Sequence, residues 1–160
     1  MEVSPELDAI DRRILRALQQ DARLTYEALA AQAGLSASAA LRRVHRLEEA
    51  GIIGAYVVLV PPERVGLHLT AYINVRLEKQ ADNSQRNPRE LFRAAVQAWP
   101  EVVECAALTG EMDYLLRVLV QDMQHYARFI DDTLLKHPCV KDCKTSFVLE
   151  RLKNTTAMPV

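Results

Sequence analysis

The sequence predicts an α+β protein of two domains, a helix-turn-helix domain at residues 1–60 and a ferredoxin-like domain at residues 61–160. Three helical patterns, each preceded by a capping residue, fill most of the first sixty residues. Beyond Pro61 and Pro62 the apolar pattern alternates between the periods of strands and helices. Because 49% of the residues are hydrophobic, each domain has enough apolar side chains to build a core.

The first two predicted helices are marked by their capping residues. Asp8 is suited to cap the first helix, with Asp11 three residues further on. The apolar stripe of this helix consists of Ile10, Ile14, Leu15 and Leu18. Thr25 caps the second helix, which ends at Gly34, and another helix follows at once from Ser36. Two helices joined by about three residues with a glycine in the turn form a helix-turn-helix.

The third predicted helix, at residues 36–51, has two contrasting faces. Ser36 can bond the free N–H groups of its first turn, and Gly51 can adopt a positive φ after its last. The apolar stripe consists of Ala37, Ala40, Leu41, Val44 and Leu47. The other face carries Ser38, Arg42, Arg43, His45 and Arg46. A helix with hydroxyls leading and arginines behind can enter a DNA major groove. The alternative is the solvated basic face of an ordinary surface helix.

Residues 52–60 change from the helical period to a β-rich composition and stop at two prolines. We expect this stretch to be extended. It is predicted as a wing strand, as a tether to the second domain, or as both.

The net charge of the first domain limits what a single copy can do with nucleic acid. Residues 1–60 hold seven arginines and eight acidic residues, so their formal charge is 7 − 8 = −1. Local charge still matters, because the screening length is about 8 Å at physiological salt and residues 36–47 contain three arginines and no acid. The sequence therefore predicts a modest DNA binder as a monomer, which needs repeated copies to bind firmly.

The second domain reads as strand, helix, strand, strand, helix, strand. The strands are predicted at residues 69–77, 102–108, 114–120 and 140–152, with a polar loop at residues 78–87. One helix begins at Pro88, and the other follows Asp122 and ends at Pro138. This order predicts the split βαβ or ferredoxin-like plan, an antiparallel sheet with both helices on one face.

The predicted strands are apolar on both sides, although the chain supplies helices for one side only. Leu115 and Leu119 alternate with Tyr114, Leu116 and Val118. A sheet that is apolar on both faces is expected to be covered on both. We therefore predict that a second copy covers the open face. A two-fold dimer would also present two recognition helices at half-sites about 34–36 Å apart.

Short motifs recur along both domains. Those of the first domain are Leu7-Asp8, Asp11, Ile14-Leu15, Gly34-Leu35-Ser36, Arg43-Val44, Arg46-Leu47-Glu48 and Gly51-Ile52-Ile53. Those of the second are Val103, Thr109-Gly110, Asp113-Tyr114-Leu115-Leu116, Thr145-Ser146-Phe147-Val148, Lys153-Asn154-Thr155-Thr156 and Pro159. In this order and spacing, over essentially the whole chain, the set resembles the leucine-responsive/asparagine-operon regulators, the Lrp/AsnC or feast/famine family.

The resemblance implies a sequence-specific transcriptional regulator that is not an enzyme. It implies an N-terminal winged helix-turn-helix that binds double-stranded DNA and a C-terminal ferredoxin-like domain that senses a small effector, usually an amino acid. It also implies homodimers that assemble into tetramers or octamers. The candidate DNA-binding residues are Ser36, Ser38, Ala39, Arg42, Arg43 and Arg46.

The resemblance places the effector near the loop at residues 109–114, where dimers meet. Gly110 permits close backbone approach, turn N–H groups can bind a carboxylate, and Asp113 can bind an ammonium group. The alternative is a tight hairpin whose Gly and Asp merely make the turn. Met112 replaces an aromatic residue frequent in the family, which leaves the ligand open. The candidate effector-binding residues are Thr109, Gly110, Glu111, Met112, Asp113, Tyr114, Thr145 and Ser146.

Other chemistry receives little support from the sequence. The spacing of His137, Cys139 and Cys143 is not a recognised zinc pattern, and an odd number of cysteines does not indicate a disulfide framework. No catalytic residue, metal site or cofactor is predicted. No apolar run approaches the roughly 20 residues of a membrane span, and the acidic N-terminus does not resemble a signal peptide. We therefore expect a cytoplasmic protein without membrane partners.

Two alternatives of other classes remain at this point. Sirohaem decarboxylases, which are enzymes, share the scaffold of this family, although an enzyme has no need of three arginines on the recognition helix. An oligomeric scaffold whose helix-turn-helix binds protein is the other alternative. Loss of DNA affinity on Arg42→Ala and Arg46→Ala would exclude the scaffold.

Overall fold

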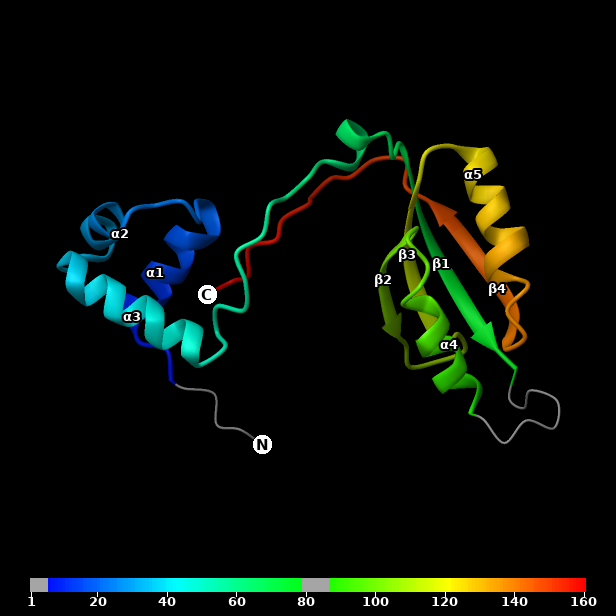
Figure 1. Ribbon diagram of the computed structural model, residues 1–160, viewed down its shortest axis with the longest axis horizontal. Coiled ribbons are helices and arrows are strands. Elements are labelled where there is room, and N and C mark those ends of the chain that lie inside the picture. The colour runs from blue at the N-terminus through cyan, green and yellow to red at the C-terminus, as the bar shows by residue number, and fades with distance from the viewer. Residues whose placement is uncertain (1–5, 79–86) are drawn as a thin grey trace. The chain divides into compact units, whose positions relative to one another are not determined.

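The computed structural model describes residues 6–78 and 87–160, in two compact units. One unit comprises Met1–Val58 and Leu152–Val160, and the other Leu59–Arg151 (Figure 1). Residues 1–5 of the acidic start of the chain and residues 79–86 of the predicted polar loop lie outside the described residues. Among the helices that are described, none is both long and apolar enough to cross a membrane.

Three helices form the first unit, as predicted: α1 at Ala9–Gln20, α2 at Tyr26–Ala33 and α3 at Ala37–Glu49. Their caps are confirmed. The Asp8 carboxylate accepts hydrogen bonds from the N–H groups of Ile10 and Asp11 at 2.9 and 2.7 Å. The Asp11 carboxylate accepts one from the Asp8 N–H at 3.2 Å, which completes a capping box. Thr25 Oγ1 accepts from the Ala28 N–H at 3.3 Å.

Helix α3 begins and ends at the residues that the sequence indicates. Ser36 Oγ accepts a hydrogen bond from the Ala39 N–H at 3.3 Å, and Gly51 has a φ of 67°. Of the predicted stripe, the fully buried members are Ala40, Val44 and Leu47, whereas Ala37 and Leu41 are only half-buried. The stripe packs on α1 and α2 in a core made by Ile14, Leu15, Ala17, Leu29, Ala33, Val44 and Leu47.

Residues 52–60 form no strand in the described chain. Ile52 and Ile53 pack beside the helical core, and the residues after them are exposed. Tyr56 is held at α3 because its hydroxyl donates to Glu48 Oε1 at 2.8 Å. A β-rich composition needs a neighbouring strand to form a ladder, and this stretch has none among the described pairings. The stretch therefore forms the connection between the units, followed by a short 3₁₀ turn, η1, at Pro62–Val65.

The last residues of the chain lie on α1. Arg16 Nε donates to the Val160 carbonyl at 2.6 Å, and Gln19 Nε2 donates to the Met158 carbonyl at 3.2 Å. Val160 also packs against the helical core. The predicted domain boundary at residue 61 stays a prediction. It assigns residues 152–160 to the second domain, although these residues pack with the first unit.

The second unit is a four-stranded antiparallel sheet in the order β2-β3-β1-β4. Its elements are β1 at Leu69–Leu77, α4 at Pro88–Val96, β2 at Val102–Ala107, β3 at Tyr114–Val120, α5 at Met123–Arg128 and β4 at Val140–Phe147. Helix α5 continues as a π-helical turn, η2, at Phe129–Leu134. This βαββαβ order confirms the ferredoxin-like plan. The last strand ends at Phe147, earlier than predicted. Phe147 pairs with Ala71 of β1, and beyond this pair the Val148 N–H still donates to the Thr70 carbonyl at 3.0 Å.

The two faces of the sheet differ. Alternate β1 residues Ala71, Ile73 and Val75 are fully buried in one core with Phe92 of α4 and Phe129 of η2. On the opposite face the side chains are mixed, contrary to the expectation of an apolar surface. Tyr72 is 36% exposed there. Its register partner Arg117 donates to Glu104 of β2 at 3.1 Å.

Candidate functional site

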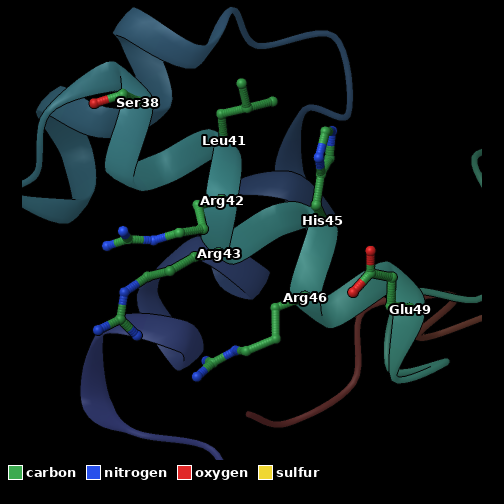
Figure 2. Close-up of a pocket in the computed structure, with 7 residues that line it drawn as sticks. All are labelled: Ser38, Leu41, Arg42, Arg43, His45, Arg46 and Glu49. Carbon is green, nitrogen blue, oxygen red and sulfur yellow. The ribbon is translucent and has the colours of Figure 1, made fainter.

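One candidate site is the outward surface of α3. The αL conformation of Gly34, with φ 72°, ends α2 and lets α3 begin at Ser36. Ser36 and Ser38 are exposed, and their hydroxyl oxygens are 3.2 Å apart. Further along the helix the surface holds a cavity of about 580 Å³ (Figure 2). We call its lining the α3 face: Ser38, Leu41, Arg42, Arg43, His45, Arg46 and Glu49.

Two of the three arginines on this face are paired with acidic side chains of the α1 capping box. Arg43 Nη1 lies 2.7 Å from Asp8 Oδ2 and 2.8 Å from Asp11 Oδ1. Arg46 Nη2 lies 2.5 Å from Asp11 Oδ2. The Asp11 side chain is only 1% exposed. The pKa of Asp8 is lowered from 3.8 to about 2, chiefly by the hydrogen bond from the Asp11 N–H and then by Arg43.

Arg42 differs from its two neighbours because it is exposed and makes no ion pair within the described part of the chain. Its guanidinium points outward from α3 in Figure 2. The ion pairs of Arg43 and Arg46 with Asp8 and Asp11 were not predicted from the sequence. The acidic partners lie 32 or 35 residues away in the chain, and their sequence pattern indicates only a helix cap. Of the DNA-binding residues predicted from the sequence, those that line the α3 face are Ser38, Arg42, Arg43 and Arg46, whereas Ser36 and Ala39 lie outside its lining. Arg42 is the arginine of this face most open to a phosphate.

The other candidate site is a polar cavity of about 800 Å³ in the second unit, at the edge where β1 ends. Gly110, with φ 117°, is part of its lining, together with Glu111 and Asp113. Such a φ favours glycine. The remaining lining residues are Arg76, Leu77, Glu78, Asn87, Pro88, Arg89 and Lys141. We call this cavity the Gly110 pocket.

Charges of both signs meet in the Gly110 pocket. Asp113 Oδ2 accepts a hydrogen bond from the Leu77 N–H at 2.9 Å, and Asp113 Oδ1 lies 3.3 Å from Arg89 Nη2. The Asp113 N–H donates to the Val75 carbonyl at 2.9 Å, so both backbone and side chain tie the loop to β1. Arg76 pairs with Asp142 and lies 3.5 Å from Glu111 Oε1. Asp142 and Glu111 raise the pKa of Arg76. The pocket is therefore suited to a ligand that itself carries both charges.

Five of the predicted effector residues do not line this pocket in a single chain. Tyr114 is buried, with its ring 4.9 Å from that of Phe92. Thr145 faces the helices and accepts a hydrogen bond from the Tyr126 hydroxyl at 2.6 Å. Ser146 is exposed on the opposite face, and Thr109 and Met112 lie outside the lining. The sequence analysis did not predict three basic residues of this pocket, Arg76, Arg89 and Lys141. They come from β1, α4 and β4 and share no sequence motif.

The His137 and cysteine cluster has ordinary structural contacts. The Cys139 N–H donates to His137 Nδ1 at 3.3 Å, and the Cys139 side chain is fully buried. Burial raises the pKa of the Cys139 thiol and lowers the pKa of His137. In residues 6–78 and 87–160 no three His, Cys, Asp or Glu side chains are grouped as a metal site would require.

Comparison with known families matches both units. The AsnC-type helix-turn-helix domain matches residues 7–48, and the Lrp/AsnC ligand binding domain matches residues 70–158. The chain belongs to the Lrp/AsnC family. The leucine-responsive regulatory protein of Salmonella typhimurium is 37% identical, over 97% of this chain and 92% of that protein. The transcriptional regulator AzlB of Bacillus subtilis is 36% identical, over 96% of both.

A solved structure extends the comparison to the fold. A transcriptional regulator from Neisseria meningitidis in complex with L-Met is 46% identical, with a TM-score of 0.90 over 96% of this chain and 97% of that chain. The chain is accordingly a DNA-binding transcriptional regulator rather than an enzyme, since its relatives are named as regulators. The names of these relatives do not support the decarboxylase alternative.

Proposed function

We propose that this Lrp/AsnC regulator binds double-stranded DNA through α3 and changes its assembly or DNA affinity when the Gly110 pocket takes up an amino acid. The DNA-contacting residues in this proposal are Ser36, Ser38, Ala39, Arg42, Arg43 and Arg46. The observation that carries it is the α3 face itself, a capped helix with exposed hydroxyls at its start and guanidinium groups behind them. Hydroxyls and arginines supply both base and phosphate contacts.

A neutral amino acid with a thioether or branched aliphatic side chain is the effector we propose. An amino acid carries one ammonium and one carboxylate, and the Gly110 pocket offers Asp113 for the former and Arg76, Arg89 or Lys141 for the latter. The relatives support this class, because one is named leucine-responsive and another was solved with L-Met. Of the effector residues predicted from the sequence, Gly110, Glu111 and Asp113 line this pocket, and we propose that these three contact the effector. Those outside the lining of a single chain are Thr109, Met112, Tyr114, Thr145 and Ser146.

Calorimetric titration with L-Met, L-Leu and D-Met tests the effector class. We expect at least one L-amino acid to bind the full chain and D-Met to bind more weakly, because inversion at Cα exchanges the positions of ammonium and side chain. Asp113→Asn keeps an acceptor for the Leu77 N–H but removes the charge opposite the ammonium, so it should abolish ligand binding while DNA binding persists. Undiminished binding by this variant would show that the effector lies elsewhere.

Assembly is part of the same proposal. One chain leaves one face of the sheet without helices, and five predicted effector residues lie outside the pocket of a single chain. We propose homodimers that assemble into tetramers or octamers and act in the cytoplasm, where the DNA is. Light scattering with and without L-Met measures the assembly directly, and a monomer at micromolar concentration would contradict it.

Salt dependence tests DNA binding. Each phosphate that a cation neutralises contributes about 0.9 to the slope of log K against log salt. Arg42→Ala should therefore lower this slope by about 0.9 per α3 helix engaged. An unchanged slope would show that Arg42 contacts no phosphate.

A further inference from the structure

The acidic pair of the α1 capping box, Asp8 and Asp11, binds two arginines of α3. Both oxygens of the Asp11 carboxylate are occupied, Oδ1 by Arg43 and Oδ2 by Arg46 and the Asp8 N–H. Asp8 adds a second acceptor for the same Arg43 nitrogen. Asp11 is the one buried charged residue of the described chain, so its position is fixed by packing as well as by hydrogen bonds.

These pairs leave much of each guanidinium available. A guanidinium group has five N–H donors, and Arg43 and Arg46 each use a single nitrogen for the acidic partners. The two side chains are 25% and 55% exposed and reach toward the start of α1 from the α3 face (Figure 2). An arginine that is held in place before binding loses less rotamer freedom when it meets a further acceptor.

Charge alone gives no reason for these acids. The formal charges of the three α3 arginines and of Asp8 and Asp11 sum to 3 − 2 = +1. Attraction of the helix to phosphate would be stronger without the carboxylates. The capping box accounts for two acidic residues at the start of α1, but capping does not require that they also bind Arg43 and Arg46. These contacts are explained if the α3 face depends on where its guanidinium groups lie more than on how much positive charge it carries.

We propose that Asp11, assisted by Asp8, is a positioning residue for sequence recognition, whose buried carboxylate sets the Arg43 and Arg46 guanidinium groups before DNA arrives. The inference rests on the proposed DNA-binding role of the α3 face. It makes an acidic residue, which DNA repels, a determinant of sequence discrimination. The ligand class is double-stranded DNA, and the quantity that Asp11 controls is the ratio of specific to non-specific affinity.

The test compares two substitutions that change charge equally. Asp11→Asn removes one negative charge and keeps oxygen and shape at the capping box. Glu27→Gln removes one negative charge from α2, where Glu27 is exposed, lies outside the α3 face and has no ion pair among the described residues. Full-length chains are titrated by fluorescence anisotropy against a duplex that the wild type selects from a random pool and against a shuffled duplex of equal composition.

The two variants are expected to differ in the ratio of specific to non-specific affinity. Glu27→Gln should tighten binding to both duplexes and keep their ratio, because it acts through charge only. Asp11→Asn should lower the ratio about tenfold, in the range of one lost base contact, with binding to the shuffled duplex unchanged or tighter. The inference is overturned if Asp11→Asn instead tightens both and keeps the ratio.

A further variant covers the case in which Asp11→Asn unfolds α1, which circular dichroism would reveal. Arg43→Lys keeps the charge but replaces the planar fork by a flexible ammonium group. It should lower the same ratio while leaving the salt slope unchanged, and an unchanged ratio would contradict the inference. If the wild-type chain enriches no sequence from the pool, the proposed function itself fails, which is distinct from either result with the variants.

Discussion

Leu47→Ala in α3 should destabilise the first unit and leave the second unit unaffected. Leu47 is 1% exposed and packs in the core shared by α1, α2 and α3. Truncation of a buried leucine to alanine costs ~2–5 kcal/mol, through lost burial and the cavity left behind. In a unit of this size, ~1 kcal/mol lowers the melting temperature by ~4–8 °C, so the expected shift exceeds ~8 °C.

Two optical signals separate the units in one melt. Far-ultraviolet circular dichroism follows the helices of both units, whereas the single tryptophan, Trp99, lies in the second unit. Leu47→Ala should shift the helical transition and leave the Trp99 fluorescence transition in place. The matched control is Leu41→Ala on the same helix, where the half-buried side chain should cost much less. Equal shifts of both signals would refute the reasoning, because they would mean that the units unfold as one.

Three further predictions concern single groups. Gly110→Ala should destabilise the second unit by ~1–3 kcal/mol in a Trp99 fluorescence melt, because alanine is strained at φ 117° even though open space surrounds its Cβ. The pKa of Asp8 is lowered from 3.8 to about 2 in the fold, so its carboxylate stabilises the fold above about pH 3.8. This contribution disappears as the pH falls toward 2. Asp8→Asn should therefore flatten the loss of circular dichroism signal in an acid titration over that range. A thiol reagent should label exposed Cys105 well before buried Cys139, and simultaneous labelling in the native protein would contradict the burial described.

The helices of the first unit were predictable because their signals are local. Asp8, Thr25 and Ser36 cap helices whose free N–H groups lie two or three residues away, and Gly51 ends α3 by its own φ. The ferredoxin-like order was predictable for the same reason, since each strand or helix shows its own period.

Strand ends were less predictable because they depend on partners. Residues 52–60 have the composition of a strand but no partner strand among those described. The ladder of β4 with β1 ends at the Phe147–Ala71 pair, five residues before the end predicted from the sequence. A ladder needs two strands, and neither the presence nor the length of the second is encoded in the first.

The candidate sites divide in the same way. The sequence by itself determined the α3 face and the glycine turn at Gly110, because helical periodicity and backbone conformation are properties of neighbouring residues. Only the tertiary structure decided that Arg43 and Arg46 share the Asp11 carboxylate, and that Arg89 meets Asp113. Such pairs bring together residues that lie far apart in the chain, and packing of the helices and strands sets their distances. The three arginines of α3 look equivalent in the sequence, and the fold leaves Arg42 exposed while it holds the other two.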